Sequence, residues 1–396
     1  MTGGTVAGAV GGVLVGGCGP DRPVALGTPD VVLADTASGL ARLRGTRAEA
    51  LGAAVPAANP ARVFATVPAG AATVLRALDA TTGRASGQVT LAGRWVPQVA
   101  SPDGRLVALT QPGGSGSRYR PVGRARTTIV VADDGAERYR LELSGNYEPD
   151  AFARDGTCLF VLEWLPPVNP DRYRVRLVEL ATGAFTAMST RDKQPVPPGT
   201  EEQMRGDGRQ SVPGPGGVVL YTLYLGPPTG SWESTESRAF VHTLDTQGGW
   251  AYCLDLPDPF GTGPATGYTV AVTPDGTRLL VADLTHGLLA VADTQSLTVT
   301  AVLPIPTGTG TAWSVAAPER ERLYLGSGTD LWAVDLDSGT AVHQIPDGEV
   351  RGLAVNGDGT RLYVGYPDAV GWRDPLRGTA LGRVPVPGLS AVRHVL

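Results

Sequence analysis

Lysine is almost missing from this chain: Lys193 stands alone against 32 arginines. Cationic side chains that bind a ligand or form ion pairs are therefore guanidinium groups. The net charge of −5 at neutral pH also argues against a general nucleic-acid-binding protein, which would show a basic face. We therefore expect no nucleic-acid partner.

Cysteine and histidine are scarce, with three and four residues in 396. There is no C-x-x-C pair and no Cys/His cluster with zinc spacing. Cys158 and Cys253 are too few for a disulfide framework, and both lie where a small buried hydrophobe would serve equally well. A bridge between them has no support in the pattern, and we expect no metal and no cofactor.

Signatures of catalysis are missing as well. Gly113–Ser117 begins like a G-x-S-x-G elbow but fails at its last position. No phosphate-binding loop and no dinucleotide-binding fingerprint occurs. Without a visible Ser–His or Cys–His pairing, nucleophilic catalysis has no candidate in the sequence.

Helical periodicity is absent too, because glycine or proline interrupts nearly every window that might carry it. The 54 glycines and 33 prolines are spread along the whole chain. Such a distribution is typical of many short strands joined by tight turns. The composition therefore predicts an all-β protein.

Residues 5–17, TVAGAVGGVLVGG, form an apolar run that ends at Cys18. The run is shorter than the ~20 residues that span a bilayer, and it fits the core of a signal peptide. Val15-Gly-Gly-Cys18 resembles a bacterial lipobox, which implies lipidation of Cys18. No basic residue precedes the run, as expected if the start codon is assigned too far downstream. A Gly-rich leader with an incidental cysteine is the alternative.

This interpretation divides the chain into a leader and tether, 1–23, and one domain, 24–396. It predicts an exported protein, anchored to the outer face of the cytoplasmic membrane by a lipid on Cys18. We expect the lipid to be its only membrane contact and the protein to be a monomer.

A four-stranded unit recurs along the chain and is clearest at 270–303, VAVTPDGTRLLVAD followed by LLAVADTQSLTVTAVL. We name its strands A to D in chain order. Strand A runs into the turn Thr273-Pro-Asp-Gly276, and strand C ends at Asp293. Proline fixes φ in the first turn, glycine tolerates a positive φ, and aspartate can bond the following backbone.

The two turns of this unit can be counted along the chain. A–B turns occur at seven places: 59–60, 101–104, 154–156, 213–216, 273–276, 317–319 and 356–359. C–D turns occur at eight: Asp35, Asp79, Asp133, Glu179, Asp245, Asp293, Asp335 and Asp374. A unit of about 40 to 60 residues with four strands is the signature of a propeller blade.

The two ends of the chain account for the mismatch between these counts. The chain opens with a hairpin, Val31–Asp35 to Leu40–Leu43, which matches strands C and D. It closes with an unpaired strand, Ser390–Leu396, that resembles strand A. Joining them completes one blade and leaves no open sheet edge. We predict a closed β-propeller of eight blades, with seven as the alternative if the unit around Gly214 is not separate.

The segment TPDGTRLLVADLTHGLLAVADTQSLTVTAVLPI resembles the YVTN-type repeat of bacterial surface propellers, a WD40-like repeat. SPDG at 101–104 resembles the turn of TolB-like (PD40) propellers. The resemblance covers nearly all of residues 30–396 and implies the architecture. It does not imply one activity, because such families include lactonases, lyases, surface-layer components and pure binding proteins.

Long insertions are expected on one face of the ring. Up-and-down blades place A–B and C–D turns on one face and B–C and D–A loops on the other. The long B–C loops are 111–126, 164–173 and 226–238, and the long D–A loops are 189–210 and 257–267. Drift alone can lengthen loops at little cost, but clustering in successive blades favours a binding face.

Strand A begins on that same face, beside the central channel. Alignment of the units on their turns predicts ligand-binding side chains at the channel mouth and on the adjoining loops, where aromatic rings with a few charges suit a concave site. The alternative is that the aromatic rings only pack between blades. The predicted residues are Trp95, Tyr147, Glu148, Asp150, Trp164, Trp232, Tyr268, Trp313 and Arg351.

Two functions remain open. The first is a non-catalytic envelope propeller that binds a protein, peptide or glycan through its loop-rich face. The second is a lactonase-like hydrolase or lyase, with Glu148 and Asp150 at the channel mouth. A tight carboxylate cluster would favour the enzyme, and a broad shallow surface would favour the binding protein.

Overall fold

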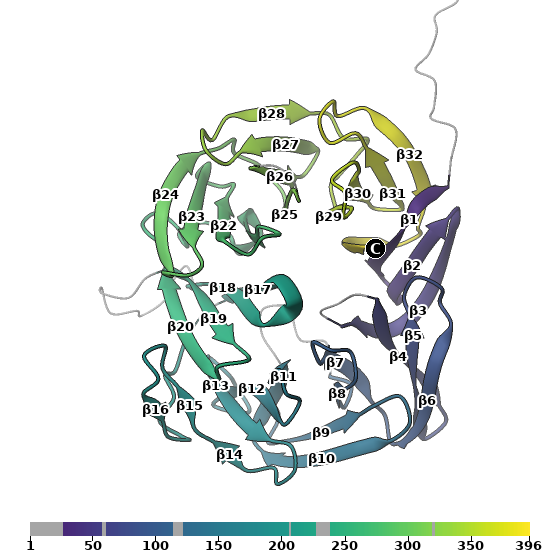
Figure 1. Ribbon diagram of the computed structural model, residues 1–396, viewed down its shortest axis with the longest axis vertical. Helices are drawn as coiled ribbons and strands as arrows, with labels where there is room; N and C mark the ends of the chain where they lie inside the picture. Colours follow the sequence, from purple (N-terminus) through teal and green to yellow (C-terminus); the bar gives the residue numbers. More distant parts are fainter. Residues whose placement is uncertain (1–26, 58–60, 114–121, 206, 227–237, 319–320) are drawn as a thin grey trace, which may run out of the picture.

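The protein is a β-propeller, built from mostly antiparallel sheets that stand around a common centre (Figure 1). In the computed structural model, residues 27–57, 61–113, 122–205, 207–226, 238–318 and 321–396 are described. Cys18, Trp232 and the turn at 59–60 lie outside these residues. No helix in the described ranges is long and apolar enough to cross a membrane.

The first sheet has seven strands in the order β33-β1-β2-β3-β4-β5-β6. Strand β3 is shared, because Arg47–Gly52 pairs with β2 and Ala53–Pro56 pairs with β4. Each half of this sheet is therefore a four-stranded unit. The strands are β1 (Thr28–Thr36), β2 (Gly39–Gly45), β3 (Arg47–Pro56), β4 (Arg62–Ala69), β5 (Ala72–Asp79), β6 (Ala85–Ala92) and β33 (Leu389–Val395).

Two sheets of four strands follow, and then one of six. The first two comprise β7 (Val96–Ala100), β8 (Val107–Thr110), β9 (Arg126–Ala132) and β10 (Glu137–Ser144), then β11 (Asn146–Phe152), β12 (Cys158–Leu165), β13 (Arg172–Glu179) and β14 (Phe185–Thr186). The six-stranded sheet comprises β15 (Met188–Ser189), β16 (Pro195–Val196), β17 (Asp207–Pro213), β18 (Val219–Leu225), β19 (Ala239–Asp245) and β20 (Trp250–Asp255).

Three further sheets, each of four strands in chain order, complete the described fold. Short 3-10 turns occur at Pro215–Gly217 and Ala265–Gly267. The strands are β21 (Tyr268–Val272), β22 (Arg278–Asp283), β23 (Leu288–Asp293), β24 (Thr298–Pro304), β25 (Ala312–Ala316), β26 (Arg322–Ser327), β27 (Asp330–Asp335), β28 (Ala341–Gln344), β29 (Leu353–Val355), β30 (Leu362–Tyr366), β31 (Ala369–Arg373) and β32 (Ala380–Pro385).

The A–B turns have the chemistry that the sequence predicts. At the turn after β21, the Gly276 N–H donates to the Thr273 carbonyl at 2.7 Å, with Gly276 at φ +74°. The Asp275 carboxylate accepts from the Thr273 hydroxyl at 2.6 Å and from the Thr277 N–H at 3.1 Å. These hydrogen bonds to the charged form hold the pKa of Asp275 below its usual value.

The two ends of the chain pair with each other, as predicted. Strand β33 is antiparallel to β1, with Val395 opposite Val32 and Leu389 opposite Thr36. One assignment is corrected: because β33 pairs with β1, the opening hairpin supplies strands B and C, and the first half of β3 supplies D. The turn after Asp35 is thus a B–C turn, whose short Asp-to-Gly loop looks the same in sequence as a C–D turn.

The core lies between neighbouring sheets rather than inside any one of them. The sheets β21–β24 and β25–β28, for example, share a cluster that includes Leu280, Leu289, Leu325 and Trp332. Each sheet buries both faces, which explains the nearly continuous apolar runs in its middle strands. The innermost strands, β33, β3, β7, β11, β17, β21, β25 and β29, border the central channel.

Candidate functional site

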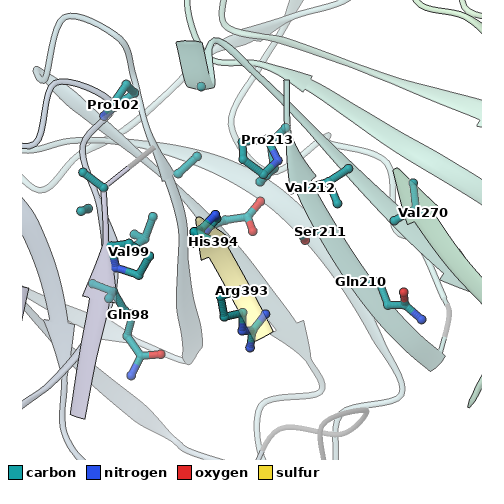
Figure 2. A pocket seen from close by; sticks show the side chains of 18 of the residues that line it. Gln98, Val99, Pro102, Gln210, Ser211, Val212, Pro213, Val270, Arg393 and His394 are labelled. Carbon is teal, nitrogen blue, oxygen red and sulfur yellow. The ribbon is translucent and has the colours of Figure 1, made fainter. Parts of the chain in front are cut away.

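A cavity of about 610 Å³ occupies the central channel (Figure 2). All the innermost strands contribute to its lining. Apolar side chains such as Val99, Val212 and Val270 alternate there with the polar Gln98 and Gln210. This volume lies within the roughly 300–1,000 Å³ of small-molecule sites.

One wall of the cavity carries a buried ion pair. Arg209 of β17 binds the carboxylate of Asp150 and reaches Glu148 Oε1 at 3.2 Å, both on β11. Burial raises the pKa of Asp150, and the Arg209 guanidinium opposes that rise. The two carboxylates that the sequence proposed for catalysis thus share one guanidinium group from a neighbouring strand.

The C-terminal strand supplies a second polar wall. Arg393 forms an ion pair with Asp35 at 2.5 Å, yet 54% of its side chain remains exposed. His394 follows it and is half-buried. Burial, assisted by the Arg393 charge, lowers the pKa of His394 to about 4. The imidazole is therefore neutral at physiological pH and can donate and accept hydrogen bonds.

Several of the predicted aromatic residues lie in the core. Tyr268 is fully buried, and its hydroxyl accepts from the N–H groups of Gly261 and Gly263 at 3.1 Å. Trp95 donates to the Ala92 carbonyl at 2.7 Å, and Tyr147 donates to Glu163 Oε1 at 2.9 Å. These three buried side chains hold loops and neighbouring sheets in place.

The remaining predicted residues are divided between the mouth and the core. Trp164 is buried near the end of β12 and donates to Glu148 Oε2 at 3.2 Å, which joins it to the Arg209 cluster. Trp313 lines the cavity, whereas Arg351 contacts the Leu389 carbonyl at 3.4 Å and Glu349 at 3.2 Å. The structure therefore brings Glu148, Asp150 and Trp164 together.

The predicted long loops contact one another. The Arg124 N–H, in the loop after β8, donates to the Pro167 carbonyl, in the loop after β12, at 2.8 Å. The Asn146 side chain donates to the carbonyls of both Val122 and Pro167, at 3.0 and 3.2 Å. Next to them, Tyr173 and Met204 exchange backbone hydrogen bonds of 2.9 and 2.7 Å. We call residues 122–126, 165–172 and 187–205 the loop face.

A buried charge network anchors part of the loop face. Glu163 binds Arg174 at 2.5 Å and Arg176 at 3.4 Å, and Arg176 also reaches Glu201 at 3.3 Å. All four side chains are mostly shielded from solvent. The Arg176 guanidinium also lies 3.5 Å from the centre of the Phe185 ring. The insertion that carries Glu201 is thereby fixed on the sheet.

A further hydrogen-bond chain fastens the loop before β21. Asp283, fully buried, binds His286 Nδ1 at 2.7 Å, and His286 Nε2 lies 3.2 Å from the Thr262 hydroxyl. That hydroxyl donates to the Pro259 carbonyl at 2.8 Å, so its proton is already engaged. Within the described ranges, no three His, Cys, Asp or Glu side chains gather with a metal-holding arrangement.

Several lining residues could not be found from the sequence. Arg209, Gln210 and Arg393 line the cavity, yet none of them belongs to a recognisable motif. Arg393 lies in the predicted C-terminal strand. Because that strand was predicted to border the channel, its position was the one sequence feature that could have identified Arg393. Arg209 closes the long 189–210 loop, where no turn motif fixes the alignment of the following strand.

The fold and its channel define a β-propeller with a loop-rich face. No family model and no curated protein matches the sequence. Among solved structures, apo AztD from Citrobacter koseri is similar, at 12% identity, over 93% of this chain and 97% of that one, with a TM-score of 0.57. This likeness supports the propeller fold.

Two other bacterial proteins also match. BamB from Moraxella catarrhalis is 16% identical over 92% of both chains, with a TM-score of 0.49. A putative 6-phosphogluconolactonase from Bacteroides fragilis is 13% identical over 93% of this chain and 98% of that one, with a TM-score of 0.47.

Proposed function

We propose that this protein is a non-catalytic propeller of the cell envelope that binds a protein, peptide or glycan through its loop face. The observation that carries the proposal is the mutual bonding of successive insertions, which makes a continuous surface out of separate loops. Val168 is 60% exposed there and Val122 is 37% exposed. We propose that these two side chains supply the apolar part of a contact with a protein or peptide.

A pull-down from envelope extract of the native organism tests this proposal. Val168→Asp places a charge within the proposed contact and should reduce ligand recovery by about tenfold or more, because burial of an unpaired charge against an apolar surface is costly. Because Val168 is exposed, its replacement should leave the melting temperature nearly unchanged. The matched control is Val342→Asp, which is also exposed and lies on β28. Equal recovery with Val168→Asp and wild type would contradict the proposal.

We infer that the ring has eight blades and that β33 closes it. The β33–β1 pairing and the shared strand β3 support this count, because they add a composite four-stranded unit to the others. Contacts across the junction lend further support. The Asp30 carboxylate accepts from the Tyr363 hydroxyl at 2.7 Å and lies 3.4 Å from Arg361, both near β30 of the adjoining sheet.

We also propose that the units are YVTN-type repeats and that the protein is an exported lipoprotein. The bonded Thr273–Gly276 turn supports the first idea, and Val15–Cys18 motivates the second. Expressed in a bacterial host with a basic N-terminus restored, the protein should incorporate a labelled fatty acid. Cys18→Ala should abolish the label. Unlabelled wild-type protein in the cytosol would contradict the lipoprotein proposal.

The cavity favours a second candidate, a hydrolase or lyase at the channel mouth. Its support is the position of Glu148 and Asp150 beside a cavity of small-molecule size. A panel of lactones and glycosides, with released acid or sugar as the readout, tests this candidate. Turnover that is lost in Glu148→Gln while the protein stays folded would favour the enzyme over the binding protein.

A further inference from the structure

The charges that line the channel cavity balance one another. Arg209 and Asp150 form one ion pair in the lining, and Arg393 and Asp35 form another. The imidazole of His394, which also lines the cavity, is uncharged at neutral pH because burial lowers its pKa to about 4. Within the described part of the chain, the lining therefore offers no charge that lacks a partner of opposite sign.

One further carboxylate lies close to this lining without belonging to it. Glu148 contacts Arg209 at 3.2 Å and accepts from the Trp164 indole N–H at 3.2 Å. Its negative charge disfavours an anion in the cavity, whereas the two guanidinium groups of the lining disfavour a cation. An ion that leaves water without gaining a partner is costly to bind. The cavity therefore suits an uncharged ligand.

Uncharged amide groups on two innermost strands retain hydrogen-bonding capacity. Gln98 of β7 makes only a long contact of 3.5 Å, to the Val96 carbonyl of its own strand. Gln210 of β17 donates from Nε2 to the Tyr268 carbonyl at 2.7 Å, which leaves its side-chain oxygen as an acceptor. In Figure 2 the two glutamines lie on either side of the C-terminal strand that carries His394. A ligand in the cavity can therefore be held by amides from separate strands.

Much of the remaining lining is apolar. Val99, Val212 and Val270 come from three different innermost strands, and Trp313 adds an indole ring from a fourth. A mainly apolar lining with a few polar groups is typical of small-molecule sites. The ligand that fits such a lining combines C–H surfaces with uncharged hydrogen-bonding groups.

A sugar has this combination. Each hydroxyl group donates one hydrogen bond and has two lone pairs to accept others, so it matches amide side chains, which also offer both roles. The C–H faces of the sugar ring suit the valine and tryptophan side chains. We propose that the channel cavity binds a small, uncharged saccharide. This site is separate from the loop face, and the inference does not rest on the function proposed for that face.

Calorimetric titration of the full chain with matched sugars tests the proposal. Glucose, galactose and mannose are each compared with the corresponding uronate and 2-amino sugar, which carry a negative and a positive charge at neutral pH. At least one neutral sugar should bind, and both of its charged counterparts should bind about tenfold more weakly or worse, because neither charge finds a partner. Failure of every neutral sugar to bind, or tighter binding of a charged counterpart, would overturn the proposal.

Variants of the two glutamines test the position of the sugar. Gln98→Leu and Gln210→Leu should each weaken binding about three- to tenfold, the range expected for loss of one hydrogen bond between uncharged groups. The matched control is Gln295→Leu, because Gln295 is exposed in the turn between β23 and β24 and does not line the cavity. Melting curves establish that each variant is folded. Unchanged affinity in both lining variants would contradict a site in the channel.

The loop-face variant separates this inference from the proposed function. Val168→Asp should bind the sugar as the wild type does, and Gln98→Leu should recover the loop-face ligand normally in the pull-down. The two proposals can therefore fail independently. Sugar binding that is weakened in Val168→Asp and unchanged in Gln98→Leu would assign the sugar to the loop face and overturn the cavity site.

Discussion

Trp164 illustrates how a side chain next to a loop can serve the core. Its ring lies 5.3 Å from that of Tyr173, which stacks on Tyr224 at 4.7 Å. Its indole N–H donates to Glu148. The sequence places this tryptophan at the start of a long loop and predicts ligand contact. The predicted position of Trp164 at the edge of the loop is correct. Its burial, however, depends on the neighbouring sheet, and the sequence pattern of a single strand does not show that contact.

Replacement of Trp164 by alanine should therefore lower stability. Removal of a buried aromatic ring costs about 3–5 kcal/mol in free energy of unfolding. Urea denaturation followed by circular dichroism measures the loss, and Trp164→Phe should retain most of the packing. A variant that unfolds at the wild-type urea concentration would mean that the ring is not packed as described.

His242 should make the stability of the protein depend on pH. Burial lowers its folded pKa to about 4, against 6.5 in the unfolded chain. Between these values the unfolded state binds more protons, so stability rises with pH and is lost on acidification from 6.5 to 4. The full contribution is about 3 kcal/mol, since each pKa unit is worth about 1.4 kcal/mol.

The measurement is the free energy of unfolding at several pH values, with His242→Gln as the matched variant. The free energy of unfolding of this variant should change less steeply between pH 4 and 6.5 than that of the wild type. The difference in slope corresponds to up to one bound proton. The half-buried His394, whose pKa is also lowered, should preserve part of the slope. Identical slopes would show that His242 is not buried in its neutral form.

Among the structural elements, the 187–205 insertion is held by a buried ion-pair network that no sequence motif predicts. The sequence shows a long loop there, and the structure adds short strands β15 and β16. Arg174 and Arg176 belong to an ordinary strand pattern, so the sequence did not show that both contact Glu201 as well as Glu163. Turns were easier to predict, because Pro-Asp-Gly chemistry is local.

Glu201→Gln should loosen this insertion, because Arg174 and Arg176 keep Glu163 as a charged partner but lose the carboxylate that the insertion supplies. Hydrogen exchange of residues 187–205 should accelerate while the strands around the channel stay protected. Glu202→Gln, at the neighbouring exposed position, is the control. Unchanged exchange in Glu201→Gln would mean that the network does not hold the insertion.

At the scale of the whole molecule, the sequence predicted the recurrence of the unit and the pairing of the chain ends. It misassigned the opening hairpin, because short Asp-to-Gly turns look alike on both faces. The sequence predicted that a site would lie at the channel, but it did not predict most of the side chains that line the cavity. Which side chains line it depends on the alignment of strands such as β17, which follows the long 187–205 insertion.

Removal of residues 390–396 should expose the edge of β1 and abolish cooperative unfolding, because the chain ends hold the first and last units together. Calorimetry measures this as loss of a single sharp transition. Conversely, cysteines at positions 34 and 392, which face each other in the β1–β33 pair, should form a disulfide that raises the melting temperature. A truncated protein that melts like the full chain would rule out this closure.

Photo-crosslinking in the native envelope tests most directly whether the loop face binds the ligand. A photoreactive amino acid at position 168 lies on the loop face, and one at position 275 lies on the opposite, turn-bearing face. We expect a discrete adduct from position 168 and none from position 275. An adduct from position 275 alone would show that the ligand binds the other face of the propeller.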